Sequence, residues 1–198
     1  MRATISVPFR LCRQRLADFR RDHSGIAATE FAVIVPLMLV LFFGVVEFST
    51  GVAVDRKVTL VARTLSDLVS QNTSVDDTKL TGIFTAGTQV MAQYTQSPYL
   101  ATTLHSTISE LYVDPNSHNA KVQWSSGYAV RATGSTVTIP TALKVDSTYL
   151  IFSEVSYLYT PTVGYVMGQS GVNLSDVSYT RPRQSPCVLY NTASCPTN

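Results

Sequence analysis

The stretch "FAVIVPLMLVLFFGVV", residues 31–46, decides the fold of this chain, because it runs for sixteen residues without a charge. Counting from Ile26 extends the apolar run to twenty-one residues if Thr29 and Glu30 are tolerated. At 1.5 Å per residue, a helix of that length reaches about 31 Å, close to the hydrocarbon thickness of a bilayer. The run therefore predicts a membrane-spanning helix over residues 26–48, and a buried helix of a soluble core is the alternative.

Two residues inside the run, Pro36 and Gly44, are unfavourable in ordinary helices. Pro36 has no amide hydrogen to donate to the carbonyl of Ala32, so it is expected to bend the axis. Both residue types are nevertheless common in membrane helices. We therefore expect Pro36 and Gly44 to lie within the membrane helix.

The basic residues are concentrated before the apolar run. Residues 1–25 hold six of the fifteen basic residues and two of the thirteen acidic ones, so this leader carries a net charge of +4 and residues 26–198 carry −2. By the positive-inside rule the leader stays in the cytoplasm, and the chain after Phe48 is exported to the periplasm. The exported part has no basic cluster of the kind that nucleic-acid binding requires. The predicted domains are a cytoplasmic leader (1–25), a transmembrane helix (26–48) and a periplasmic α+β domain (49–198).

Glu30 is a charge at the beginning of an apolar helix, and it has two interpretations. In the first, its side chain reaches toward the lipid head groups or meets a basic residue of the leader. In the second, the chain is cut after Gly25, and the new ammonium group of Ile26 lies one helical turn from Glu30. A neighbouring copy could supply that ammonium group as well. Such a pair would offset the desolvation of both charges and fix the axial register between subunits.

These residues resemble a family, the TadE-like pseudopilins of the tight adherence (Tad or Flp) pilus system, which are relatives of type IV pilins. Gly25, four residues and then Glu30 and Phe31 are similar to the site where a prepilin peptidase cuts after glycine. The segment "AATEFAVIVPLMLVLFFGVVEF" resembles the TadE-like motif as a block. Further on, "SEVSYLYTP" (153–161) and "YTRPRQ" (179–184) resemble the C-terminal strands of alphaproteobacterial members.

The resemblance implies a function in assembly. It implies a processing site formed by Gly25, Ile26, Glu30 and Phe31. It also implies a membrane-anchored minor pseudopilin of the bacterial inner membrane. Its partners would be the lipid bilayer, pilins, other pseudopilins and a prepilin peptidase. Many members are bitopic proteins, so an uncleaved anchor is the alternative to cleavage after Gly25.

The exported part begins with helical periodicity. Apolar residues recur at spacings of 4, 3, 4 and 3 along Val54, Val58, Val61, Leu65 and Leu68, which predicts that the membrane helix continues as an amphipathic helix to about Ser70. The stretch "QNTSVDD" (71–77) then interrupts, and a second helix is expected to begin at Thr73 or Ser74, with Asp76 and Asp77 in its first turn. Its expected buried face is Leu80, Ile83, Phe84, Gly87, Val90, Met91 and Tyr94.

After Pro98 the composition changes to Thr, Ser, Val and Tyr, which is typical of strands. The turn "DPNSHN" (114–119) predicts an antiparallel hairpin. The sequence thus predicts an α+β, pseudopilin-like fold: a single N-terminal transmembrane helix continuing into an amphipathic helix, a second helix, and a small antiparallel sheet. Its strands are expected at 102–113, 120–125, 147–160 and 172–182.

The cysteines divide by compartment. Cys12 falls in the leader, whereas Cys187 and Cys195 would both be periplasmic, where disulfides form. A disulfide between them would close a loop of nine residues and stabilise the tail by roughly 2 to 3 kcal/mol. Two free thiols are the alternative.

The chain carries no motif of an enzyme. No HExxH, CxxC, Gly-rich phosphate loop or G-x-S-x-G accompanies His105 or His118, so both are interpreted as surface histidines. We expect no catalytic residues, metal, cofactor or small-molecule substrate. A set of aromatic residues either packs the sheet or contacts partner subunits: Tyr149, Phe152, Tyr157, Tyr159 and Tyr165.

Two classes of function remain. The first is a structural component of pilus assembly. The second is a secreted or periplasmic binding module released by signal peptidase, because "GVA" (51–53) offers small residues at the positions that such an enzyme reads.

Overall fold

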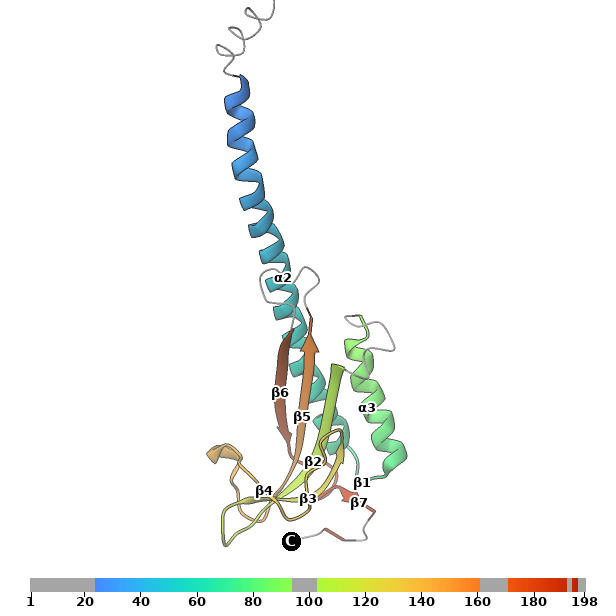
Figure 1. The fold of residues 1–198 in the computed structure, drawn as a ribbon. Helices are drawn as coiled ribbons and strands as arrows, with labels where there is room; N and C mark the ends of the chain where they lie inside the picture. The colour runs from blue at the N-terminus through green and yellow to red at the C-terminus, as the bar shows by residue number, and fades with distance from the viewer. Residues whose placement is uncertain (1–23, 94–102, 161–170, 192–193, 196–198) are drawn as a thin grey trace, which may run out of the picture. The chain divides into compact units, whose positions relative to one another are not determined.

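The computed structural model describes residues 24–93, 103–160, 171–191 and 194–195. The chain divides into two compact units, Met1–Val46 and Glu47–Asn198. Residues 1–23 of the predicted leader, Cys12 among them, lie outside the described residues. An α+β fold with one long apolar helix and an antiparallel sheet is confirmed (Figure 1).

Helix α2 (Ser24–Ser70) contains Pro36 and extends to the residue at which the amphipathic helix was expected to end. It is long and apolar enough to cross a membrane. Its residues up to Val46 belong to the first unit. From Val54 onward the predicted apolar face is buried in the core of the second unit, except that Leu68 is only partly buried.

Helix α3 (Asp77–Met91) begins later than expected. Its N-cap is Asp76, whose Oδ1 accepts a hydrogen bond of 2.7 Å from the Lys79 amide. A start at Thr73 or Ser74 is wrong, because Ser74 and Val75 form strand β1 (Ser74–Val75), which pairs in parallel with β7 (Leu189–Tyr190). A carboxylate caps the free amides of a first turn.

The buried face of α3 agrees with the predicted pattern over the described residues. Leu80, Ile83, Gly87 and Met91 are buried, and two further apolar residues, Phe84 and Val90, pack against the same core while partly exposed. Tyr94 lies outside the described residues.

Five antiparallel strands form the main sheet, in the order β4-β3-β2-β5-β6. Their bounds are β2 (Leu104–Val113), β3 (Ala120–Gly127), β4 (Thr136–Val137), β5 (Tyr149–Tyr159) and β6 (Val172–Thr180). The four predicted strands are confirmed within two residues at each end, and the turn at 114–119 joins β2 and β3. A short 3-10 helix, η1 (Thr141–Leu143), follows β4.

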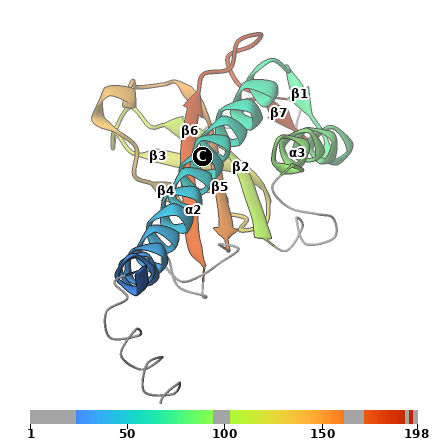
Figure 2. The same ribbon diagram turned by 90° about the horizontal axis from the view of Figure 1, so that it is seen from above.

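The two faces of this sheet hold separate cores. We call the face against α2 the inner face (Figure 2). There the Ser153 hydroxyl donates to the Ala62 carbonyl at 2.5 Å. On the outer face a smaller cluster gathers around Leu111, Val122 and Phe152. The aromatic residues Tyr149, Phe152, Tyr157 and Tyr159 are all buried, which supports sheet packing, and Tyr165 lies outside the described residues.

A β-bulge in β3 places two residues that would share a face on opposite faces of the sheet. Glu110 pairs with Trp124 and the next residue, Leu111, pairs with Val122, so Gln123 is an extra residue in β3. In a regular strand Val122 and Trp124 would point to the same side. Instead Trp124 belongs to the inner core and Val122 to the outer one, because the bulge reverses the alternation.

The C-terminal segment returns to the end of α2. The Arg183 amide donates to the Ser70 carbonyl at 2.9 Å, and the Arg183 guanidinium lies 2.5 Å from Asp67 Oδ1. Beyond them, Cys187 and Cys195 are joined in a disulfide with their Cα atoms 5.8 Å apart. The Cys187 side chain is fully buried, and the next residue, Val188, belongs to the inner core.

Candidate functional site

The first unit presents an apolar helix without a packing partner among the described residues. Thirteen large apolar side chains between Ile26 and Val46 are between 42% and 75% exposed. Side chains of this kind are normally buried in water-soluble domains. An exposed apolar surface of this extent indicates a lipid or protein environment for the helix.

The predicted processing residues lie in the first two turns of α2. Gly25, Ile26, Glu30 and Phe31 are all exposed. Neighbouring them, the Thr29 hydroxyl donates to the Ile26 carbonyl at 2.8 Å. The structure brings these four residues onto one short helical segment.

Gly25 has open surroundings among the described residues. A Cβ atom added at this position would meet nothing within 4 Å, and its backbone is not in the left-handed region. Among the described residues, nothing in the packing requires a glycine at this position. Gly82 in α3 has the same open surroundings and provides a matched position for comparison.

The other two predicted membrane residues occupy different surroundings. Pro36 lies inside α2, and Gly44 is half-buried near the end of the first unit. Three residues later, at the start of the second unit, Glu47 is only 4% exposed. Burial raises the pKa of the nearby Tyr159 hydroxyl, and the charge of Glu47 raises it further. Glu47 was not among the predicted site residues, although it is the next carboxylate after Glu30.

A second missed carboxylate, Glu110, lies on the inner face of the sheet. It is fully buried, with Oε2 accepting from Trp124 Nε1 at 3.0 Å and Oε1 from the Val188 amide at 2.6 Å. Trp124 Nε1 also lies 2.9 Å from the Val188 carbonyl. Burial raises the pKa of Glu110 from 4.5 to about 7, against the opposing effect of both hydrogen bonds. Glu110 thus attaches the segment next to Cys187 to the sheet.

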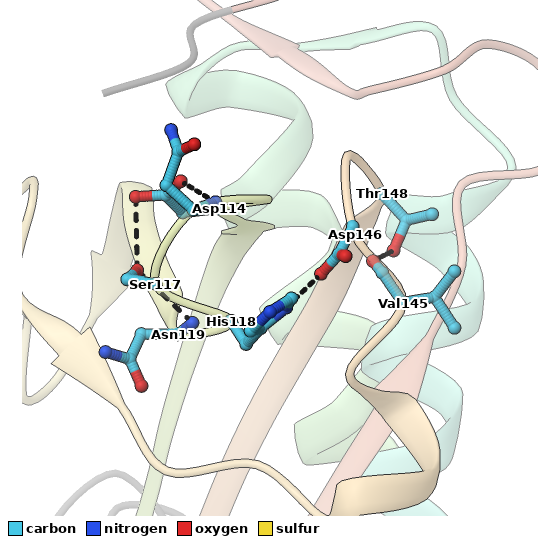
Figure 3. A network of polar contacts seen from close by, with 8 residues as sticks. Asp114, Ser117, His118, Asn119, Val145, Asp146 and Thr148 are labelled. Atoms are coloured by element: carbon cyan, nitrogen blue, oxygen red, sulfur yellow. Dashed lines mark hydrogen bonds and ion pairs between the residues drawn. The ribbon is translucent and has the colours of Figure 1, made fainter.

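The two described histidines have different partners. His118, in the turn after β2, has a φ of 55° and places Nδ1 2.7 Å from Asp146 Oδ1, as Figure 3 shows. Its neighbour Asp114 accepts from the Asn116 amide and the Ser117 hydroxyl, and these contacts, the first above all, lower the pKa of Asp114. His105 stacks on Tyr128 with ring centroids 3.7 Å apart.

A groove of about 430 Å³ lies beside this stack on the outer face. Across it, Arg131 binds Glu154 through two hydrogen bonds of 2.7 and 2.6 Å, which raise the pKa of Arg131. The two charged groups therefore neutralise each other. Within the described part of the chain, no group of three or more His, Cys, Asp or Glu residues is placed to hold a metal ion.

Comparison with known proteins adds one finding. Residues 25–65 match the model of the family described as TadE-like protein. The match begins at the predicted processing glycine, confirms the resemblance over these residues and is consistent with a TadE-like protein of the Tad pilus system. No curated protein matches the chain. No solved structure matches it either.

Proposed function

We propose, starting from the TadE-like segment at residues 25–65, that the chain is a minor pseudopilin-like component of Tad pilus assembly. It is held in the bacterial inner membrane by α2, with its N-terminus in the cytoplasm and residues 49–198 in the periplasm. Its role is structural rather than enzymatic.

The observation that carries this proposal is the exposed helix with a glutamate at its beginning. The large apolar side chains between Ile26 and Val46 are exposed. A helix that packs among other apolar helices needs such an exposed apolar surface. Glu30 lies five residues after Gly25, where an added Cβ atom would meet nothing within 4 Å among the described residues. Cleavage after Gly25 by a prepilin peptidase would create the ammonium group that Glu30 can pair with, in the same chain or in a neighbouring pilin.

The alternative, release by a signal peptidase at residues 51–53, has less support. These residues lie in the middle of α2, and Gly51 is buried. The next residue, Val54, is fully buried in the core of the second unit. A cut at this point would interrupt the helix where it enters that core.

Glu30→Gln tests the assembly role. The neutral side chain should insert into the membrane at least as well as glutamate, because a carboxylate is costly near hydrocarbon. It cannot pair with an ammonium group, so the number of pili per cell should fall while the amount of membrane-bound protein stays the same.

Asp55→Asn is the matched control, because it also neutralises an exposed carboxylate of α2 and should leave piliation at the wild-type level. Normal piliation by Glu30→Gln, or equal losses from both variants, would contradict the proposed role of Glu30.

A further inference from the structure

We propose that the second unit has a lipid-contacting rim at the end where α2 meets the β5–β6 end of the sheet, so that the bilayer surface touches the sheet as well as the helix. This inference rests on the proposed membrane anchor and names a further contact that the anchor would make. We define the rim by four exposed apolar side chains: Phe48, Val52, Leu158 and Val172.

The rim encloses an apolar groove of about 210 Å³ within the second unit. Besides three of the rim residues, its lining includes Gly51, Leu174 and Tyr159, and Asp55 is its one charged residue among those that the structure describes. A polar or anionic partner would find almost no complementary group here. Apolar chains fit it better.

The chain itself brings the bilayer to this level. From Ile26 to Phe48 the helix rises about 33 Å at 1.5 Å per residue, slightly more than the hydrocarbon core of about 30 Å. Val52 is about 6 Å further along, within the interfacial region. Charges then follow at Asp55, Arg56 and Lys57, where the helix would leave that region.

The sheet reaches the same level through its pairing. Tyr159 at the end of β5 pairs with Val172 at the start of β6, and both line the groove together with Phe48. Val172 therefore continues, on the inner face of the sheet, the apolar surface that Phe48 and Val52 begin on the helix. Leu158 lies at the same end of β5 but on the outer face, because its neighbours Tyr157 and Tyr159 belong to the inner core. Because the rim is continuous with the proposed membrane helix, lipid is favoured over a second copy as its occupant.

The opposite end of the sheet supplies a matched control. Val145 is 42% exposed and Leu158 is 41% exposed, so the two side chains differ little in accessibility. Val145 precedes the start of β5 and Leu158 lies near its end, and a strand of this length spans roughly 30 Å. A lipid contact at the rim would therefore reach Leu158 and not Val145.

The test places an environment-sensitive fluorophore on single cysteines of the full chain. In a Cys12→Ser background that keeps the native disulfide, Leu158→Cys, Val172→Cys, Val145→Cys and Val40→Cys are labelled. The proteins are reconstituted into phosphatidylcholine vesicles containing lipid with a nitroxide on the acyl chain near the head group. We expect at least twofold stronger quenching at Leu158 and Val172 than at Val145.

The probe at Val40 separates the two proposals. Val40 is an exposed residue in the middle of the apolar run, so its probe should be quenched if the helix spans the bilayer. If the probe at Val40 is quenched while those at Leu158 and Val172 are quenched as weakly as the one at Val145, the proposed lipid contact of the rim is wrong. The proposed membrane anchor is then unaffected. No quenching at Val40 overturns both. A third outcome is that the nitroxide lipid does not quench the rim probes, and that these probes become shielded from water only as the number of protein molecules per vesicle rises. In that case a second copy covers the rim, and the lipid contact is overturned.

Discussion

At the scale of single residues, Glu110 shows how one carboxylate joins distant parts of the chain. Its two oxygens accept hydrogen bonds from Trp124 on β3 and Val188 in the C-terminal segment. Full burial makes the charged form unfavourable, which raises the pKa of Glu110 to about 7. The folded protein therefore holds this proton more tightly than the unfolded chain does.

The sign of the resulting pH dependence follows from that difference. Between pH 4.5, the ordinary pKa, and about pH 7, the folded state binds more protons than the unfolded state, so stability falls as pH rises. The contribution of Glu110 is complete below the ordinary pKa and is lost above about pH 7. It amounts to roughly 3 kcal/mol across this window. Glu110→Gln should remove this slope, because glutamine does not titrate.

Urea unfolding of the detergent-solubilised protein at several pH values measures this effect. Trp124 is the single tryptophan and contacts Glu110, so its fluorescence reports on the relevant part of the fold. Glu154→Gln, elsewhere in the sheet, should keep the slope. An unchanged slope in Glu110→Gln would show that other groups cause the pH dependence.

The site residues that could be predicted from the sequence are those whose relevant neighbours lie close to them in the chain. The interval from Gly25 to Glu30 is visible in the sequence because it lies within two helical turns. Glu47 and Glu110 could not be recognised, since their burial depends on β-strand residues far away in the chain. For Glu110 the decisive partner, Trp124, faces it only because of the bulge at Gln123, and the sequence pattern gives no sign of that bulge.

At the scale of elements, one helix serves two environments. Up to Val46 the apolar side chains of α2 are exposed, whereas from Val54 onward its apolar face is the centre of the inner core. Helix α3 packs closely, through Gly87, against the part of α2 that begins at Val54. A Cβ atom added at Gly87 would lie 3.0 Å from Leu65 Cδ2 and 3.3 Å from Val61 Cγ1.

Gly87→Val should therefore destabilise the second unit by about 1–3 kcal/mol, the usual range for overpacking a core. Gly82→Val, on the exposed side of the same helix, should change stability by less than about 0.5 kcal/mol. Urea unfolding measures both. Equal effects of the two variants would mean that helix propensity rather than close packing decides the outcome.

Long elements were predictable because their periodicity extends over many residues. The 4, 3, 4, 3 spacing in α2 and the β-rich composition after residue 98 each identified an element within a few residues. The two-residue strands β1, β4 and β7 carry no such pattern and exist only through their pairing partners. The start of α3 was misplaced for the same reason, because pairing with β7 takes Ser74 and Val75 out of the helix.

At the scale of the whole molecule, the two units have complementary properties. The first offers an apolar helix that the described residues leave uncovered, and the second is an α+β domain with buried cores on both faces of its sheet. A disulfide and the buried Glu110 hold the C-terminal segment on that domain. A protein that is assembled through its helix and presents a stable domain outside the membrane needs both properties.

We propose that the chain matures by cleavage between Gly25 and Ile26. The intact mass of the membrane-extracted protein is the most direct measurement of this cleavage. The protein should be produced in cells that contain a prepilin peptidase. Gly25→Val should leave the chain uncut, whereas Gly82→Val, at an equally open helical glycine, should be cut normally. The account predicts a chain that begins at Ile26. A wild-type chain that begins at Met1 would contradict it, and one that begins at Val54 would favour the secreted module.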